Sequence, residues 1–121
     1  NFAREEGFDD VILLNAEGRI CEATSSNVFL IKDKLIFTPS LAEGCVDGVL
    51  RSVLLNHFDV VETVITQEQL SSADSLFLTN TIQGMRAIAA INGKNYTIEP
   101  VNNIHQQYLE LLSANIGKPL R

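Results

Sequence analysis

Residues 22–31, EATSSNVFLI, join a run of short polar side chains to a strongly apolar segment. The apolar half, residues 27–31, is rich in β-branched and aromatic side chains, which favours a β-strand. The polar half places a carboxylate, several hydroxyls and an amide directly before that strand. The simpler interpretation is a polar loop between two strands. The functional interpretation is a group of short donors around a carboxylate, as an anionic or heteroaromatic ligand would need.

Apolar segments on both sides of this stretch predict β-hairpins. Upstream, residues 11–14 predict a buried strand and residues 19–22 the strand that returns, with Gly18 available for positive φ in the tight turn between them. Downstream, residues 35–38 predict a strand that pairs back with 27–31 across a polar turn, and Pro39 ends it. Hairpins imply antiparallel pairing in this part of the chain.

The rest of the chain alternates helical and strand patterns. Apolar residues at helical spacing predict one helix opening at residues 47–48 and a terminal amphipathic helix over 101–112. Asp47 is the predicted N-cap of the first helix, and Thr66 with Gln69 forms a capping box that opens a short helix. Further strands are predicted over residues 58–65, 75–79 and 85–91, the last followed by an Asn92-Gly93 turn. This order predicts a mixed α/β fold.

Composition excludes several classes of function. The chain has 121 residues, enough for one domain, and a formal charge of −6 with no basic stripe for nucleic acid. Its apolar runs are too short to cross a bilayer. Cys21 and Cys45 lack metal-ligand spacing, so no metal site is predicted. Two isolated thiols and no export signal suggest a reducing, cytoplasmic setting.

Two other stretches carry polar groups where an anion could bind. Residues 44–51, GCVDGVLR, run from a glycine-bearing loop into a helix N-terminus, whose free N–H groups attract anions. Gly48 would let the backbone approach a phosphate, whereas Asp47 could occupy the same cap. Residues 78–84, LTNTIQG, are a strand that ends in hydroxyls and an amide. They form either a strand-end turn or a second set of phosphate donors.

The order and spacing of these segments resemble those of one enzyme family. The matching segments are residues 22–29, 37–39, 48–51, 73–74 and 78–81. Together they resemble the class IV (fold type IV) aminotransferases, which include branched-chain aminotransferases, D-amino-acid aminotransferases and aminodeoxychorismate lyases. The resemblance extends from about residue 7 to the terminal helix. It implies the cofactor pyridoxal 5′-phosphate and an α/β fold with a mixed sheet or pseudo-barrel, antiparallel hairpins and flanking helices.

The resemblance assigns a role to each polar stretch. Glu22 matches the glutamate that pairs with the pyridine nitrogen of the cofactor and keeps it protonated, which makes the ring a better electron sink. The hydroxyls that match positions lining the cofactor or reaching the substrate are those of Thr24, Ser25 and Ser26. The residues that match the phosphate-binding positions, with Asp47 turned away from the anion, are Gly48, Val49, Leu50, Asn80, Thr81 and Ile82.

The family's Schiff-base lysine lies upstream of the glutamate, further than this chain reaches, and so does a phosphate-binding arginine. No lysine here is predicted to be desolvated as a Schiff-base lysine requires, whether Lys32, Lys34, Lys94 or Lys118. We therefore expect residues 1–121 to be the C-terminal cofactor-binding domain of a larger enzyme. We expect no catalytic residue in this chain and no activity from it alone.

The expected function of the parent enzyme is amino-group transfer between an amino acid and a 2-oxo acid, as in a branched-chain aminotransferase. Aminodeoxychorismate lyase is the alternative, because it shares the cofactor frame and residues 38–41 with 44–48 resemble the lyase. A non-catalytic ligand-binding domain that kept the fold is the alternative from another class. A homodimer is expected by analogy, with no nucleic-acid or membrane partner.

Overall fold

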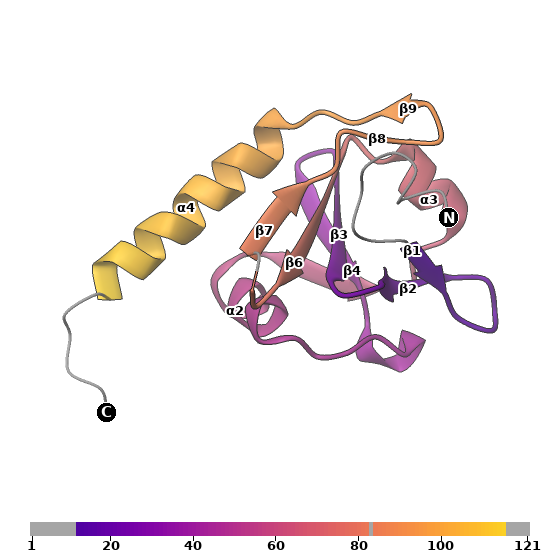
Figure 1. Cartoon of the computed structure of the whole chain (residues 1–121), viewed down its shortest axis with the longest axis horizontal. Helices are drawn as coiled ribbons and strands as arrows, with labels where there is room; N and C mark the ends of the chain where they lie inside the picture. Colours follow the sequence, from indigo (N-terminus) through magenta and orange to yellow (C-terminus); the bar gives the residue numbers. More distant parts are fainter. Residues whose placement is uncertain (1–11, 83, 116–121) are drawn as a thin grey trace.

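The computed structural model describes residues 12–82 and 84–115. A five-stranded sheet in the order β5-β4-β3-β6-β7 forms its centre (Figure 1). Two short two-stranded sheets, β1-β2 and β8-β9, accompany it. The strands are β1 (Ile12–Leu14), β2 (Ile20–Ala23), β3 (Asn27–Lys32), β4 (Leu35–Pro39), β5 (Val60–Thr63), β6 (Ser75–Asn80), β7 (Gly84–Ala87), β8 (Ala90–Ile91) and β9 (Lys94–Asn95). The helices are the 3-10 helix η1 (Leu41–Glu43), α2 (Val49–His57), α3 (Gln67–Ser72) and α4 (Glu99–Asn115).

The sheet is mixed, as predicted. β3 pairs antiparallel with both β4 and β6, and β7 continues the antiparallel order on β6. The β3–β4 turn places Asp33 and Lys34 at φ 51° and 69°, the left-handed values of a tight hairpin. β5 pairs parallel with β4, because the chain crosses over through α2 before it returns to the sheet. β1 also pairs antiparallel with β2, so the predicted hairpins on both sides of the 22–31 stretch are confirmed.

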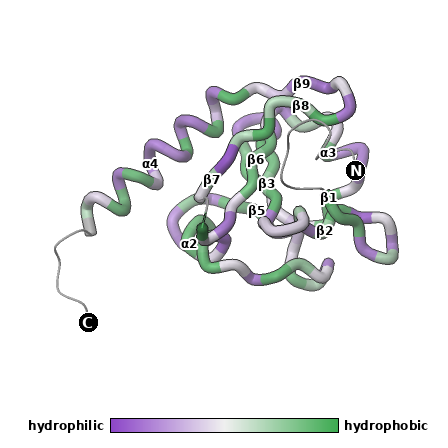
Figure 2. Tube along the Cα trace, viewed as in Figure 1, coloured by the Kyte–Doolittle hydropathy of each residue, from purple (hydrophilic) through white to green (hydrophobic). Residues whose placement is uncertain are grey.

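The two faces of the sheet carry separate cores. Val28 and Leu30 of β3 pack with β2, α3 and Tyr96 on one face. Phe29 and Ile31 pack with α2 and α4 on the other face, where Phe29 stacks on Phe77 of β6 with ring centroids 4.9 Å apart. Because both faces are covered, β3 and β6 are apolar without alternation (Figure 2).

Three predictions about strands need correction. Residues 11–14 are predicted to be buried, yet Leu13 and Leu14 are 40% and 46% exposed, because β1 lies with β2 in a two-stranded sheet apart from the central one; Val11 lies outside the described residues. The strand predicted over 58–65 is limited to β5, because Phe58 still caps α2 through its N–H to Leu54. The strand predicted over 85–91 is two strands, since β7 stays on β6 while β8 turns to pair with β9.

The last two helices of the described residues, α3 and α4, agree with the sequence pattern. Thr66 and Gln69 form the predicted capping box, with reciprocal hydrogen bonds of 3.1 and 2.8 Å. α4 buries Val101 and Ile104 against the sheet, whereas Leu112 is 46% exposed. The later half of α4 extends beyond the sheet (Figure 1). No helix of the described residues is long and apolar enough to span a membrane.

Candidate functional site

The three polar stretches of the sequence meet at one cavity of about 270 Å³. It lies where the β2–β3 loop, the loop before α2 and the end of β6 come together, and α2 packs beside β6 (Figure 1). Its lining residues are Glu22, Ala23, Thr24, Ser25, Ser26, Asn27, Val46, Gly48, Thr79, Asn80 and Thr81. The fold therefore brings together segments that are more than fifty residues apart in the sequence.

Glu22, in the half-buried part of β2, joins two walls of the cavity. Its Oε1 accepts a hydrogen bond of 2.7 Å from the backbone N–H of Val46, in the loop before α2. One carboxylate oxygen thus holds the loop, and a carboxylate has a second oxygen that can accept from a further donor.

Asn27 was not among the predicted site residues, and the structure assigns it a holding role. Its Nδ2 donates to the backbone carbonyl of Val46 at 2.7 Å. The peptide groups on the two sides of Val46 are thereby anchored, by Glu22 at the N–H and by Asn27 at the carbonyl. An amide at the first position of a strand is too common a pattern to have identified this role from sequence.

The start of α2 corrects the prediction that Asp47 is the N-cap. Gly48 occupies that position with φ −66°, and no side chain caps the helix. The Asp47 carboxylate instead accepts hydrogen bonds of 3.2 Å from both Arg51 and Ser52. A Cβ at Gly48 would collide with Oδ1 of Asn27, so either that side chain or the start of α2 would have to shift to accept it. Within the part of the chain that the structure describes, no side chain therefore caps the N–H groups of the first turn.

The end of β6 is tied to the polar loop of the opening stretch. Nδ2 of Asn80 donates to Oγ of Ser26 at 3.2 Å, and its Oδ1 accepts from the N–H of Ile82 at 2.9 Å. Thr81 lines the cavity and is exposed, as are Thr24 and Ser25.

Three of the predicted residues lie outside the cavity lining. Leu50 is buried, and the side chains of Val49 and Ile82 are 68% and 95% exposed. Any contact that these residues make with a ligand in the cavity must therefore come from their backbones.

Thr79 is a site residue that the sequence did not single out. It lies directly opposite Asn27 in the β3–β6 pairing and lines the cavity. It is 1% exposed, and its Oγ1 is buried without a hydrogen-bond partner among the described residues. A buried, unpaired hydroxyl is costly, which makes Thr79 an unusual residue for the wall of this cavity.

Replacing Thr79 with valine is expected to stabilise the ligand-free protein, by about 1 kcal/mol, because it removes an unpaired buried hydroxyl at nearly constant volume. Thr38 provides the matched control. It is equally buried, but its Oγ1 donates to the Val28 carbonyl at 2.7 Å. Thr38→Val should therefore destabilise the protein. Urea unfolding measures the change in the free energy of unfolding of both variants. If Thr79→Val is destabilised, the Thr79 hydroxyl has a hydrogen-bond partner in the native protein.

A partly buried ion pair supports the loop that carries Val46. Glu43 of η1 is 6% exposed and accepts hydrogen bonds of 2.5 and 3.2 Å from Arg19, and one of 3.1 Å from Asn15. The hydrogen bond from Arg19 lowers the pKa of Glu43, so the carboxylate stays charged. The β1–β2 turn is thereby clamped to the segment that leads into α2.

The cysteines and lysines near this region carry no evident chemistry. Cys21 and Cys45 are free, and burial raises the pKa of both thiols, which makes them poor nucleophiles. Lys34 and Lys94 are exposed, and Lys32 is half exposed beside Asp74 at 3.7 Å; Lys118 lies outside the described residues. No described lysine has the buried setting of a Schiff-base lysine. The described residues also hold no cluster of potential metal ligands.

Comparison with known proteins gives the family. The model of the family described as "Amino-transferase class IV" matches residues 1–91. A probable branched-chain-amino-acid aminotransferase from Thermotoga maritima is 38% identical over 101 residues, which are 78% of this chain and 37% of that protein. This chain therefore belongs to the class IV aminotransferase family, as its sequence motifs predicted.

Solved structures agree with this assignment. The branched-chain aminotransferase from Thermoproteus uzoniensis, crystallised with norvaline, superimposes with a TM-score of 0.84 at 28% identity, over 94% of this chain and 40% of that one. A putative 4-amino-4-deoxychorismate lyase from Legionella pneumophila superimposes with a TM-score of 0.77 at 28% identity, over 87% and 43%. The chain thus spans about two fifths of the length of these proteins.

Proposed function

We propose that this chain is the C-terminal, cofactor-binding domain of an aminotransferase that uses pyridoxal 5′-phosphate to move an amino group between an amino acid and a 2-oxo acid. The observation that carries the proposal is the meeting of Glu22, the uncapped start of α2 and the end of β6 at one cavity. The branched-chain aminotransferases among its relatives favour a branched-chain amino acid as the donor.

The donor set fits the chemistry of this cofactor. A phosphate needs several N–H and O–H donors, and the cavity offers the start of α2 and the Thr81 hydroxyl. The absence of a Cβ at Gly48 leaves the helix start close to Asn27. We assign the phosphate to the backbones of Gly48, Val49, Leu50, Asn80, Thr81 and Ile82, together with the Thr81 hydroxyl.

Glu22 is assigned to the other end of the cofactor. Pyridoxal phosphate, when bound, supplies an electron sink for the charge that develops at the amino-acid Cα. Oε2 of Glu22 would hold the proton on the ring nitrogen, since a carboxylate beside that nitrogen favours its charged form. Thr24, Ser25 and Ser26 would line the cofactor or reach the substrate from the β2–β3 loop.

The proposed domain does not supply the covalent lysine. We assign that group, and the second phosphate-binding side chain, to the upstream part of the whole protein, because the exposure of the described lysines does not suit the role. We further propose a homodimer, by analogy with the family, and a cytoplasmic location, which the two free thiols favour.

An aminodeoxychorismate lyase is the second candidate. The structural similarity to the Legionella pneumophila protein favours it, because both reactions use the same cofactor frame. Assay of the whole protein separates the two. An aminotransferase converts 2-oxo acids when offered leucine, isoleucine or valine, whereas a lyase releases pyruvate from aminodeoxychorismate without an amino acceptor.

The cofactor assignment has its own test. Thr81→Val in the whole protein should weaken pyridoxal phosphate affinity by roughly tenfold, because it removes a hydrogen bond to a charged group. The kcat of the saturated enzyme should change little. Thr97→Val, at an exposed threonine outside the cavity lining, is the control. Titration followed by cofactor absorbance measures both, and a wild-type protein that takes up no pyridoxal phosphate would refute the proposal itself.

A further inference from the structure

Arg51 is the largest fully buried side chain of the described residues, at 1% exposure. It lies in the first turn of α2, three residues after the glycine that caps the helix. Burial of a guanidinium is costly unless charged and polar partners surround it. The partners of Arg51 therefore show what this burial achieves.

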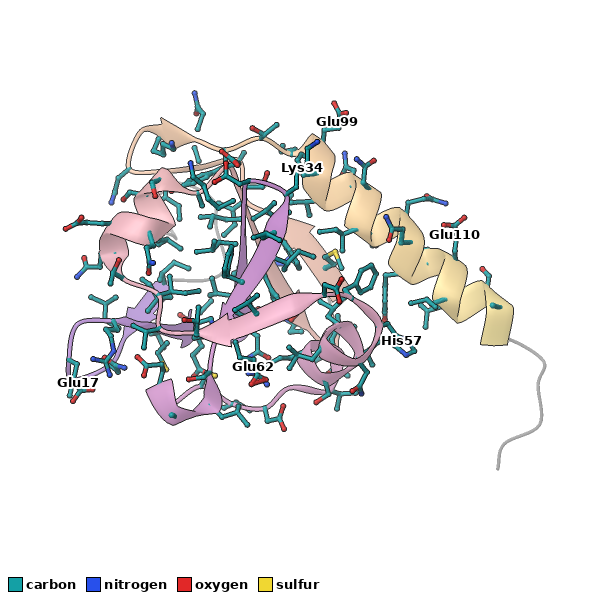
Figure 3. All side chains as sticks on the ribbon, turned by 180° about the vertical axis from the view of Figure 1, so that it is seen from behind. Glu17, Lys34, His57, Glu62, Glu99 and Glu110 are labelled. Carbon is teal, nitrogen blue, oxygen red and sulfur yellow. The ribbon has the colours of Figure 1, made fainter. Side chains whose placement is uncertain are left out.

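Arg51 joins three segments around the helix start. Nη2 donates to the Pro39 carbonyl at the end of β4, at 3.2 Å, and to Oε1 of Glu62 on β5, at 3.3 Å. Nη1 donates to Oδ1 of Asp47, at 3.2 Å. Figure 3 shows Glu62 projecting from β5. The guanidinium thus neutralises two half-exposed carboxylates, of which only Asp47 adjoins the helix cap.

The Asp47 contact matters for the cavity. A carboxylate next to a helix N-terminus competes with an incoming anion, since it is attracted by the same N–H groups and dipole. In the structure, Arg51 and Ser52 hold the Asp47 carboxylate and α2 has no side-chain cap. Thr79, which lines the same cavity, has a buried hydroxyl with no hydrogen-bond partner among the described residues.

Resting on the proposed function, we propose that Arg51 is a positioning residue of the phosphate site: it neutralises the Asp47 carboxylate and holds it off the start of α2, which leaves the first-turn N–H groups to the cofactor phosphate. Arg51 touches no ligand in this role. Its effect on phosphate binding passes through Asp47 and not through Glu62, although it binds both.

The test is a set of variants of the whole protein titrated with pyridoxal phosphate and, separately, with inorganic phosphate. Arg51→Gln should weaken both affinities by roughly three- to tenfold, because the freed carboxylate competes at the helix start. Arg51→Gln combined with Asp47→Ala should recover most of that loss. Arg51→Gln combined with Glu62→Gln should not recover the affinity, although Glu62→Gln also removes one negative charge. Thermal unfolding of each variant reports the structural cost separately.

Asp47→Ala alone keeps the proposal testable if the Arg51 variants do not fold. Asp47 is about half exposed, so this variant should fold, and its phosphate affinity should stay within roughly twofold of wild type because the carboxylate is already held off. A large gain in affinity would show that Asp47 competes in the wild type, and a large loss would show that it helps binding. Either result overturns the role of Arg51.

The outcomes separate this inference from the proposed function. If wild type binds pyridoxal phosphate but removal of Asp47 fails to rescue Arg51→Gln, or Glu62→Gln rescues it equally, the positioning role is wrong and the proposed function stands. If wild type binds neither pyridoxal phosphate nor inorganic phosphate, the phosphate site does not exist, and both the proposed function and the role of Arg51 are refuted.

Discussion

Replacing Glu22 with glutamine in the whole protein is expected to lower kcat by roughly 10²- to 10³-fold while the cofactor remains bound, the range found when a preorganised electrostatic group is removed from an active site. The structure explains why this variant removes the charge and keeps the hydrogen bond. Oε1 of Glu22 accepts the Val46 N–H, and the amide oxygen of glutamine can accept the same hydrogen bond. The loop before α2 therefore stays in place, and only the negative charge at the ring nitrogen is lost.

A second variant, Glu22→Ala, separates the two roles of Glu22, which are its negative charge and its hydrogen bond to Val46. Glu22→Ala loses the charge and also the anchor of Val46, so it should lower cofactor affinity as well as kcat. Glu68→Gln, at an exposed position of α3, is the control for loss of a carboxylate. Steady-state kinetics and cofactor titration of all three variants provide the data. Full activity of Glu22→Gln would disprove the pairing with the ring nitrogen.

Replacing Gly48 with alanine is expected to weaken pyridoxal phosphate binding by roughly tenfold or more, the cost of forcing one extra methyl group into a tight site. The new Cβ would collide with Oδ1 of Asn27, whose amide is fixed by its hydrogen bond to Val46. Either that bond breaks or the start of α2 shifts. Backbone strain does not contribute, because φ at Gly48 is −66°, an ordinary value for alanine.

A double-mutant cycle with Asn27→Ala isolates the collision. Removal of the amide relieves the clash, so Gly48→Ala should cost much less in the Asn27→Ala background than in the wild type. Cofactor affinity is the measurement, with thermal unfolding as the check on folding. If Gly48→Ala lowers cofactor affinity equally in both backgrounds, the requirement for glycine does not come from contact with Asn27.

Local patterns predicted most of the elements that carry the site. The β3–β4 hairpin, the Asn92-Gly93 turn and the Thr66 capping box all formed where the sequence placed them. Each depends on residues within a few positions of one another, so that short stretches contain the whole signal. The segments that line the cavity were also found, because polar side chains at the ends of apolar strands stand out.

The roles of individual residues around the cavity required the fold. Asp47 has the sequence features of an N-cap, but in the fold its carboxylate accepts hydrogen bonds from Arg51 and Ser52. Thr79 and Thr38 are both threonines in strands, and only their three-dimensional neighbours make one hydroxyl unpaired and the other satisfied. Asn27 holds the loop before α2 because that loop passes beside it and its Val46 carbonyl accepts a hydrogen bond from the Asn27 amide.

The sequence alone therefore determined the family, the mixed α/β class, the positions of most strands and helices, and the stretches that form the site. The tertiary structure alone decided which side chain caps α2, where Arg51 finds its partners, and why Gly48 and Thr79 matter. The physical reason is the range of the interactions. Turn and helix preferences act between neighbours in the chain, whereas burial, steric approach and pairing of polar groups depend on residues brought together by folding.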